Sequence, residues 1–240
     1  MNYMHIKLNS AKFAILFLLS FLNPSFASYE LTILAPQEIS YPITEIVRKY
    51  VKEYNDNIYL ILENEEKNIK FLEDGEGANI IITTHPQWIN ALKQKGLIDV
   101  TSIKKLVTNK FILASNSLNI NNYGNDFLNI ISNNNIYVEK DNNLVYYQQL
   151  EQNINNINLI YTDEHYIDTL QSKTNSIVLI TNSKANQDIN KIMYIPQEYY
   201  DIMSYNIAII SNDNMTGTRK LFEFITNSDS YEIFKKHGLE

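Results

Sequence analysis

The residues best placed to do chemistry form a short polar turn, Thr83, Thr84 and His85. The turn follows an apolar run at residues 78–83 and precedes a helical pattern at residues 87–95 that ends before Gly96. A strand that leads into a helix in this way presents backbone N–H groups and short side chains at the carboxyl edge of a sheet, where open α/β folds bind ligands. The turn therefore predicts a ligand-binding site.

Other residues could support catalysis or metal binding, but their spacing favours neither. His85, His165 and His237 lie too far apart in the sequence for the short spacings of zinc motifs. His85 could act as a general base, yet a lone His before Pro is more often a turn residue. The pair Tyr199 and Tyr200 invites a ferric-ion site, although aromatic residues in such a connection more often pack over a loop. Because no nucleophile elbow, P-loop or dinucleotide-binding motif occurs, we expect neither an enzyme nor a bound cofactor or metal.

Apolar runs and helix-spaced patterns alternate along the chain. We expect strands at residues 29–35, 58–62, 78–83, 110–114, 136–139, 158–161, 176–181, 192–195 and 205–210. We expect helices at residues 43–54, 67–74, 87–95, 125–131, 144–153, 216–225 and 229–236, and one that is capped by Thr162 or Asp163 and ends near Gln171. This alternation predicts an α/β fold with parallel sheets and helices on both of their faces.

The amino terminus has the features of a cleavable secretion signal. Lys7 and Lys12 precede an apolar run at residues 13–22, which is too short for a bilayer core that needs roughly 20 residues. Pro24 ends this run, and small residues at Ser25 and Ala27 predict cleavage after Ala27, with a signal peptide at residues 1–27. We therefore expect a periplasmic protein with no stable membrane anchor after cleavage.

The charge balance excludes one class of partner. Residues 1–27 hold two Lys and no acid, so the remaining chain carries 18 basic and 27 acidic residues, a net charge of −9. Nucleic-acid binding needs basic patches, so no nucleic-acid partner is expected. The chain has no Cys, which leaves stability to the apolar core, and 45% of the residues are apolar.

Five segments together resemble the periplasmic molybdate-binding proteins of ABC importers. They read LTILAPQEISYPITEIVRKYVKEY, ANIIITTHPQWINALKQKGLI, NKFILAS, SIVLITNSKANQDINKIMYIPQEYYDIMSYNIAIISND and LFEFITNSDSYEIFKKHGLE. Their order and spacing agree with that family from about Tyr29 to the end, with the weakest match between Leu118 and Thr174. The most specific pieces are the segment around Trp88 and the closing FKKHG. Neither is a catalytic signature, so the resemblance concerns fold and family.

The resemblance implies a type II periplasmic-binding-protein fold with two lobes, each a mostly parallel sheet with helices on both faces. The chain would cross between the lobes near Lys110–Ser115 and near Met203–Ile209. Lobe 1 would hold residues 28–110 and 205–240, and lobe 2 would hold residues 111–204. A small solute or anion would lie between the lobes, held by hydroxyls and by amides at helix amino termini, with the lobes closing as a hinge. An ABC permease would be the partner, and a monomer is expected.

The departures from the family fall on its ligand positions. Where the family has a Ser after its first strand, this chain has Glu38, and where a second Ser opens the next helix it has the run Glu63–Glu66, although such a run is usually a solvated face. Where the family has a Tyr hydroxyl, this chain has Leu179. The expected ligand-binding residues, including amides of the second lobe, are Gln37, Glu38, Ser40, Asn64, Glu65, Thr83, Thr84, Asn142, Thr162 and Leu179.

The acidic replacements bear on the charge of the ligand. A dianion about 4 Å from one carboxylate is repelled by roughly 8 kcal/mol at an effective dielectric constant near 20, more than a few charge-assisted hydrogen bonds return. Three alternatives stay open. The protein binds a neutral or cationic solute, or it binds an oxyanion through main-chain amides with Glu38 turned away, or it is a degenerate family member that serves an envelope partner.

Overall fold

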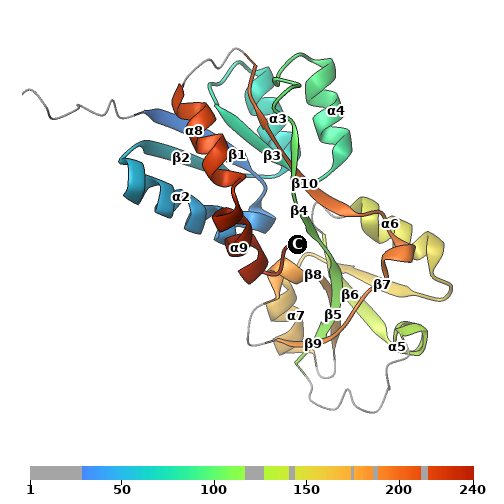
Figure 1. The fold of residues 1–240 in the computed structure, drawn as a ribbon. Coiled ribbons are helices and arrows are strands. Elements are labelled where there is room, and N and C mark those ends of the chain that lie inside the picture. Colours follow the sequence, from blue (N-terminus) through green and yellow to red (C-terminus); the bar gives the residue numbers. More distant parts are fainter. Residues whose placement is uncertain (1–28, 117–126, 141–143, 174–175, 186–188, 212–215) are drawn as a thin grey trace, which may run out of the picture.

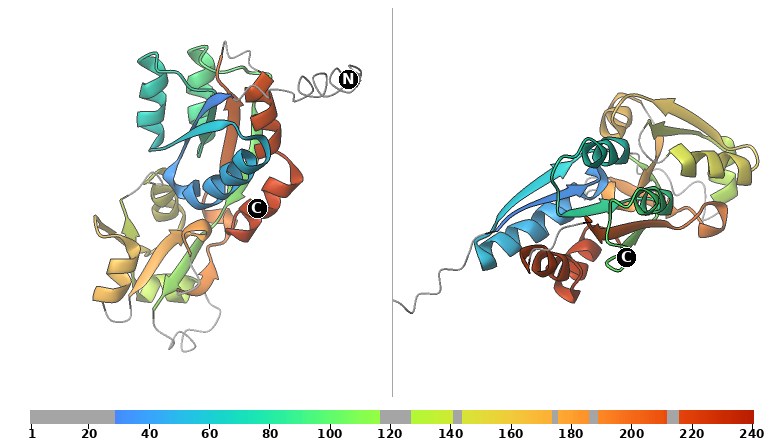
Figure 2. Two further views of the ribbon diagram at one scale, coloured as in Figure 1. Left: turned by 90° about the vertical axis from the view of Figure 1, so that its left-hand side faces the viewer. Right: turned by 90° about the horizontal axis from the view of Figure 1, so that it is seen from above.

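The computed structural model describes residues 29–116, 127–140, 144–173, 176–185, 189–211 and 216–240. Its strands form two separate five-stranded sheets, one in each of two lobes, which lie one above the other in Figure 1. Figure 2 shows the same two lobes from two further sides. The predicted two-lobed α/β fold is thus confirmed.

The first sheet has the strand order β2-β1-β3-β10-β4. Strands β1, β2 and β3 are parallel to one another, whereas β10 runs antiparallel to both β3 and β4. The bounds are Glu30–Ala35 for β1, Asn57–Leu62 for β2, Ile80–Thr83 for β3, Lys104–Asn109 for β4 and Met203–Ile209 for β10.

The second sheet repeats this arrangement with the order β7-β6-β8-β5-β9. Strands β6, β7 and β8 are parallel, and β5 runs antiparallel to both β8 and β9. The bounds are Phe111–Ser115 for β5, Asn135–Glu139 for β6, Asn158–Thr162 for β7, Ile177–Thr181 for β8 and Asn190–Tyr194 for β9. The chain passes between the sheets at Lys110, between β4 and β5, and again across residues 195–202, between β9 and β10.

Helices cover both faces of each sheet. In the first lobe, α2 (Ser40–Tyr54), α8 (Thr216–Ile225) and α9 (Ser228–Lys236) pack on one face, and α3 (Glu65–Glu73) and α4 (Pro86–Gln94) pack on the other. In the second lobe, α5 (Phe127–Asn133) and α6 (Leu144–Asn153) oppose α7 (Tyr166–Ser172) across the sheet. Three short 3-10 helices complete the described elements: η1 (Gln37–Ile39), η3 (Asn182–Lys184) and η4 (Gln197–Tyr199).

The central strands explain why each lobe has a core on both sides of its sheet. In β3, Ile80 and Ile82 join the core under α2, while Ile81 joins the core under α3 and α4. Successive side chains of a strand point to opposite faces of the sheet, so an unbroken apolar run places buried side chains on both faces. The run at β8 does the same in the second lobe, where Leu179 and Ile180 lie in different clusters.

The secondary-structure predictions were wrong at two places. Strand β4 was not predicted, because its first two residues, Lys104 and Lys105, are exposed and interrupt the apolar pattern. Helix α7 begins after His165, not at Thr162 or Asp163. The sheets are mostly parallel as predicted, and each also contains antiparallel pairing by the strand that enters from the other lobe. Among the described residues, no helix is long and apolar enough to cross a membrane.

Candidate functional site

Three polar residues follow three neighbouring parallel strands of the first lobe. Glu38 lies just after β1, Glu65 just after β2 and Thr84 just after β3. These strands are adjacent in the order β2-β1-β3, so their carboxyl ends meet at one edge of the sheet. Ligands of open α/β folds bind at such an edge.

Glu65 is buried at this edge, with 2% of its surface exposed. It is the first residue of α3, and the preceding residue, Asn64, caps the helix by accepting a hydrogen bond from the backbone N–H of Lys67 at 2.9 Å. Oε1 of Glu65 accepts a hydrogen bond from the backbone N–H of Thr84 at 3.0 Å and a second, short one from the Thr84 hydroxyl. The expectation that the run Glu63–Glu66 is a solvated face is therefore wrong for Glu65.

Glu38 lies in η1, which contacts η3 of the second lobe, so it stands where the lobes meet. Tyr205 of β10 is fully buried nearby. Burial raises the pKa of the Tyr205 hydroxyl well above its usual value, and the negative charges of Glu38 and Glu65 raise it further. Two carboxylates from different strand ends thus act on one buried hydroxyl.

The second lobe contributes Tyr146, in the first turn of α6. Its ring lies 5.5 Å from the His85 ring, centroid to centroid, and this contact joins the two lobes. Tyr146 is 2% exposed, and its hydroxyl makes no hydrogen bond within the part of the chain that the structure describes. Burial raises the pKa of this hydroxyl, and the charges of Asp201 and Glu65 add to the rise, so Tyr146 stays protonated.

His85 adds no positive charge that would balance the carboxylates at neutral pH. It caps α4, and its Nδ1 accepts a hydrogen bond from the backbone N–H of Gln87 at 3.1 Å. Burial lowers the pKa of its imidazole below 6.5, although the charge of Asp201 opposes this shift. The neutral ring therefore carries its proton on Nε2.

Thr83 supplies another buried hydroxyl. Thr83 is the last residue of β3 and is fully buried. Its Oγ1 has no hydrogen-bond partner among the described residues. Buried polar groups in native proteins are almost always hydrogen-bonded, and exceptions call for an explanation. The Thr83 and Tyr146 hydroxyls are two such exceptions, one on each side of the junction between the lobes.

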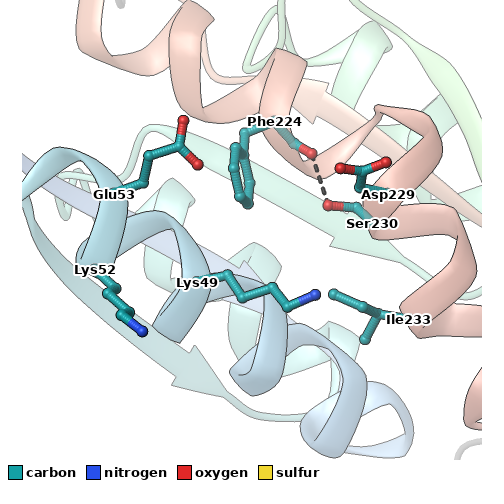
Figure 3. Close-up of a pocket in the computed structure, with 7 residues that line it drawn as sticks. All are labelled: Lys49, Lys52, Glu53, Phe224, Asp229, Ser230 and Ile233. Atoms are coloured by element: carbon teal, nitrogen blue, oxygen red, sulfur yellow. Dashed lines mark hydrogen bonds between the residues drawn. The ribbon is translucent and has the colours of Figure 1, made fainter.

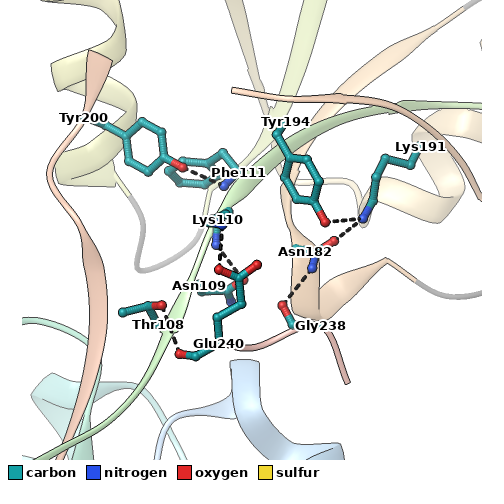
Figure 4. Close-up of polar contacts among 10 residues, drawn as sticks. All are labelled: Thr108, Asn109, Lys110, Phe111, Asn182, Lys191, Tyr194, Tyr200, Gly238 and Glu240. Atoms are coloured by element: carbon teal, nitrogen blue, oxygen red, sulfur yellow. Dashed lines mark hydrogen bonds and ion pairs between the residues drawn. The ribbon is translucent and has the colours of Figure 1, made fainter. Parts of the chain in front are cut away.

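Polar contacts at the crossing strands hold the lobes together (Figure 4). Asn109, 1% exposed at the end of β4, donates to the Ser183 hydroxyl of the second lobe at 2.7 Å and to the Tyr205 hydroxyl at 3.3 Å. At the carboxyl end of the chain, the Asn182 side chain donates to the Gly238 carbonyl at 2.7 Å, and the Lys110 ammonium lies 2.5 Å from the Glu240 carboxylate. This network links β4, η3 and the segment after α9.

The remaining predicted site residues lie in varied places. Gln37 is exposed, and Ser40 is half-buried at the start of α2. Thr162 ends β7, an edge strand of the second sheet, and its hydroxyl accepts from the backbone N–H of Glu164. Leu179 is buried in the core of the second lobe, paired with Leu113. Asn142 lies outside the described residues.

The structure thus brings Glu38, Glu65, Thr83 and Thr84 to one edge of the first sheet, and it adds three residues that sequence reasoning missed. They are Tyr146, Tyr205 and Asn109, each buried and polar. The pair Tyr146 and Tyr147 reads in the sequence as packing, and Tyr146 does pack, with its ring 6.1 Å from the Phe111 ring. No local signal in the sequence shows that its ring contacts His85 of the other lobe.

Tyr199 and Tyr200 have packing roles of their own. The Tyr200 hydroxyl accepts a hydrogen bond from the backbone N–H of Phe111 at 3.1 Å, and the Tyr199 ring lies 5.4 Å from that of Phe127. Across the described residues, no three His, Asp or Glu side chains are grouped closely enough to hold a metal ion. Nothing in this arrangement favours a ferric-ion site.

A separate surface pocket of about 340 Å³ lies between α2, α8 and α9 of the first lobe (Figure 3). Its lining residues on α2, Lys49, Lys52 and Glu53, belong to the half of the helix away from Ser40, which starts the helix near the junction of the lobes. Phe224 and Asp229 line the opposite side. The pocket is therefore distinct from the polar cluster between the lobes.

Comparisons with known proteins agree with this architecture. The family of bacterial extracellular solute-binding proteins matches residues 31–240, so the chain belongs to that family. A comparison with curated proteins finds no match.

Several solved structures share the fold. One is described as the substrate-binding domain of a molybdenum ABC transporter from Clostridium difficile, with a TM-score of 0.75 and 17% identity, covering 89% of this chain and 99% of that one. The periplasmic molybdate-binding protein of Azotobacter vinelandii gives a TM-score of 0.71 and 11% identity, covering 88% and 98%. Peb3 from Campylobacter jejuni gives a TM-score of 0.65 and 16% identity, and the match covers 88% of this chain and 99% of that one. At these identities the likeness shows the fold alone.

Proposed function

We propose that this protein binds a small polar solute between its two lobes and delivers it to an ABC permease. The family supports solute binding, and the similar solved structures include a domain of a molybdenum ABC transporter and a periplasmic molybdate-binding protein. The signal-like amino terminus is consistent with a periplasmic location. The ligand residues we assign are Glu38, Glu65, Thr83 and Thr84 of lobe 1, Tyr146 of lobe 2 and Tyr205 of the crossing strand. We place all of them where the two lobes face each other, with the lobes divided as the resemblance implies.

One observation carries the proposal. The hydroxyls of Thr83 and Tyr146 are buried without a hydrogen-bond partner among the described residues, and they come from opposite lobes. Leaving such a group unsatisfied costs about 1–3 kcal/mol. A bound solute that contacts both hydroxyls would recover that free energy and hold the lobes together, which is how two-lobed binding proteins close.

The proposed ligand differs from molybdate. Two carboxylates, Glu38 and Glu65, stand where hydroxyl donors would be needed, and His85 is neutral. Electrostatic repulsion of a dianion by a carboxylate in direct contact with it exceeds what a few hydrogen bonds supply. The fold can therefore be kept while the chemistry of the ligand changes.

Thermal unfolding of the purified protein tests the proposal. The panel contains molybdate, tungstate, sulfate, phosphate, ferric citrate, L-lysine, putrescine, glucose and neutral amino acids. A solute at 100 times its Kd adds about 2.7 kcal/mol of stability, which raises the Tm by roughly 5–10 °C for a chain of this size. We expect at least one compound to do so.

Two variants locate the binding. Tyr146→Phe and Thr83→Val each remove one buried hydroxyl and should reduce the shift, whereas Tyr231→Phe, at a partly exposed position on α9, should leave it unchanged. A flat response to the whole panel, or a shift that survives both cleft substitutions, would contradict solute binding between the lobes.

A further inference from the structure

The turn between β3 and α4, where His85 contacts Tyr146 of the second lobe, holds two hydrogen-bond donors that are already in use. They are the backbone N–H and the hydroxyl of Thr84. Their common acceptor is Oε1 of Glu65, which reaches them from the first turn of α3, nineteen residues earlier in the chain. The contact is buried on both sides, with Glu65 2% and Thr84 5% exposed.

Donors of this kind are what an oxyanion needs. Backbone N–H groups of turns, together with short hydroxyls, bind phosphate, sulfate and carboxylate groups. A carboxylate is itself an oxyanion, and Glu65 is fixed by its own helix in the position to be bound. An external oxyanion would have to displace it or share the site with a like charge.

We propose that Glu65 is an internal anion that occupies the oxyanion-binding donors of the cleft, so that the native solute donates hydrogen bonds and carries no negative charge. The inference deepens the proposed function and rests on it for the location of the cleft. It makes Glu65 the residue that determines specificity at that site.

The other groups of the cleft fit a ligand of this kind. The buried hydroxyls of Thr83 and Tyr146 lack partners among the described residues, and each can accept a hydrogen bond as well as donate one. Glu38 brings a second acceptor from the end of β1. The charges that act on the buried Tyr205 hydroxyl are those of Glu38 and Glu65, both negative. An uncharged or cationic solute with several N–H or O–H groups would meet acceptors from both lobes.

Replacing Glu65 should therefore create oxyanion binding. Glu65→Ser removes the charge and frees the Thr84 donors, and Glu65→Gln removes the charge but keeps an oxygen in the same place. Glu66→Ser is the matched control, because Glu66 is the next residue of the same helix turn, carries the same charge and is exposed. Each protein is titrated with sodium molybdate and with sodium sulfate by isothermal calorimetry at constant ionic strength, and circular dichroism reports folding.

We expect no saturable binding in the wild type or in Glu66→Ser, and an affinity about 100-fold higher or more in Glu65→Ser, the size expected when two charge-assisted hydrogen bonds form. Glu65→Gln should gain less than Glu65→Ser, because it relieves the repulsion but leaves a side-chain oxygen on the Thr84 donors. If Glu65→Ser does not fold, Glu65→Gln alone decides the matter.

Two results would overturn the inference. One is tight molybdate or sulfate binding by the wild type, and the other is folded Glu65→Ser and Glu65→Gln proteins that gain nothing. Failure of the proposed function has a different signature, namely a wild type that is unresponsive to the whole solute panel. If no solute of the panel stabilises the wild type but Glu65→Ser binds an oxyanion, the proposed transport function is contradicted and the proposed role of Glu65 is supported.

Discussion

The two lobes have the same strand order and bring different chemistry to the space between them. In each sheet three parallel strands are followed by an antiparallel pair, in the orders β2-β1-β3-β10-β4 and β7-β6-β8-β5-β9. The first lobe presents the carboxylates of Glu38 and Glu65 beyond its strand ends, whereas the second lobe presents the Tyr146 ring and the turn η3. In the second lobe the acid at the end of β6, Glu139, is paired with Lys184 at 3.4 Å.

This difference shows that architecture and ligand chemistry are set by different residues. The strand order depends on apolar runs that bury both faces, such as β3 and β8. The chemistry depends on the few residues just past each strand end, which can change without disturbing the core. The proposed change of ligand therefore requires no change of fold.

The largest expected effect is a loss of stability when the aromatic core of the second lobe is disrupted. Phe111 begins β5, is fully buried, and lies 5.1 Å from the Tyr200 ring and 5.4 Å from the Tyr147 ring, measured between centroids. Phe111→Ala should lower the free energy of unfolding by about 3–5 kcal/mol, measured in urea. Leu128→Ala, at an exposed position of α5, is the control and should change it by less than about 0.5 kcal/mol. A loss below 1 kcal/mol at Phe111 would show that this aromatic cluster contributes little to the second lobe.

Next in size is the contact through which the lobes share hydrogen bonds. Asn109→Ala removes the donor to Ser183 and to Tyr205 and the acceptor of the Lys110 backbone N–H at 2.9 Å. Because buried partners lose their hydrogen bonds, the free energy of unfolding should fall by about 1–3 kcal/mol. Asn206→Ala, at a half-buried position of β10, should cost less. Equal losses at the two sites would mean that Asn109 has no special part in joining the lobes.

An effect of about the same size is expected where the end of α9 meets the second lobe. Gly238 has φ +80°, and a Cβ there would lie 2.8 Å from Asn182 Nδ2 and 2.9 Å from Asn182 O. Gly238→Ala should lower the free energy of unfolding by about 1–3 kcal/mol through strain and crowding. Gly96→Ala shares the positive φ, +68°, but has nothing within 4 Å of the added Cβ, so only about 1 kcal/mol should be lost. If Gly96→Ala lowers the free energy of unfolding as much as Gly238→Ala does, crowding against Asn182 does not contribute to the loss.

The smallest expected effect is a pH dependence confined to the first lobe. Hydrogen bonds from His237, at 3.1 Å, and Lys236 lower the pKa of Glu45 below 4.5. A carboxyl whose pKa is lower in the folded state stabilises that state above its unfolded pKa, and this contribution is lost as the pH falls through the folded value. Because the Glu45 side chain is only half-buried, Glu45→Gln should cost only about 0.2–1 kcal/mol at pH 7, and the difference from the wild type should vanish below the lowered pKa. A difference that persists at low pH would contradict this origin.

Much of the fold follows from local sequence patterns. The bounds of α6 and α8 are those that the helical spacing predicts, and the strands at β3 and β8 follow from unbroken apolar runs. Strand β4 does not, because it is held in place by pairing with β10, about a hundred residues later, rather than by its own apolar pattern. Pairing partners at such separations leave no signal in a single sequence.

The candidate site was only partly predictable for the same reason. The turn at Thr83 and Thr84 and the acids at Glu38 and Glu65 could be named, since they follow predicted strands. The burial of Glu65 depends on its contact with Thr84, and the position of Tyr146 depends on how the second lobe meets His85. Both are tertiary contacts that a single sequence does not reveal. From the sequence alone, the acid run around Glu65 is therefore predicted to be solvated, and Tyr146 is predicted only to pack in the core.

The most direct test of the central claim follows the backbone N–H of Thr84 by nuclear magnetic resonance while sodium molybdate is added. The account predicts that the Thr84 resonance of the wild type does not move, because Glu65 already accepts that hydrogen bond, and that it moves saturably in Glu65→Ser. A saturable shift of the Thr84 resonance in the wild-type protein would contradict the account.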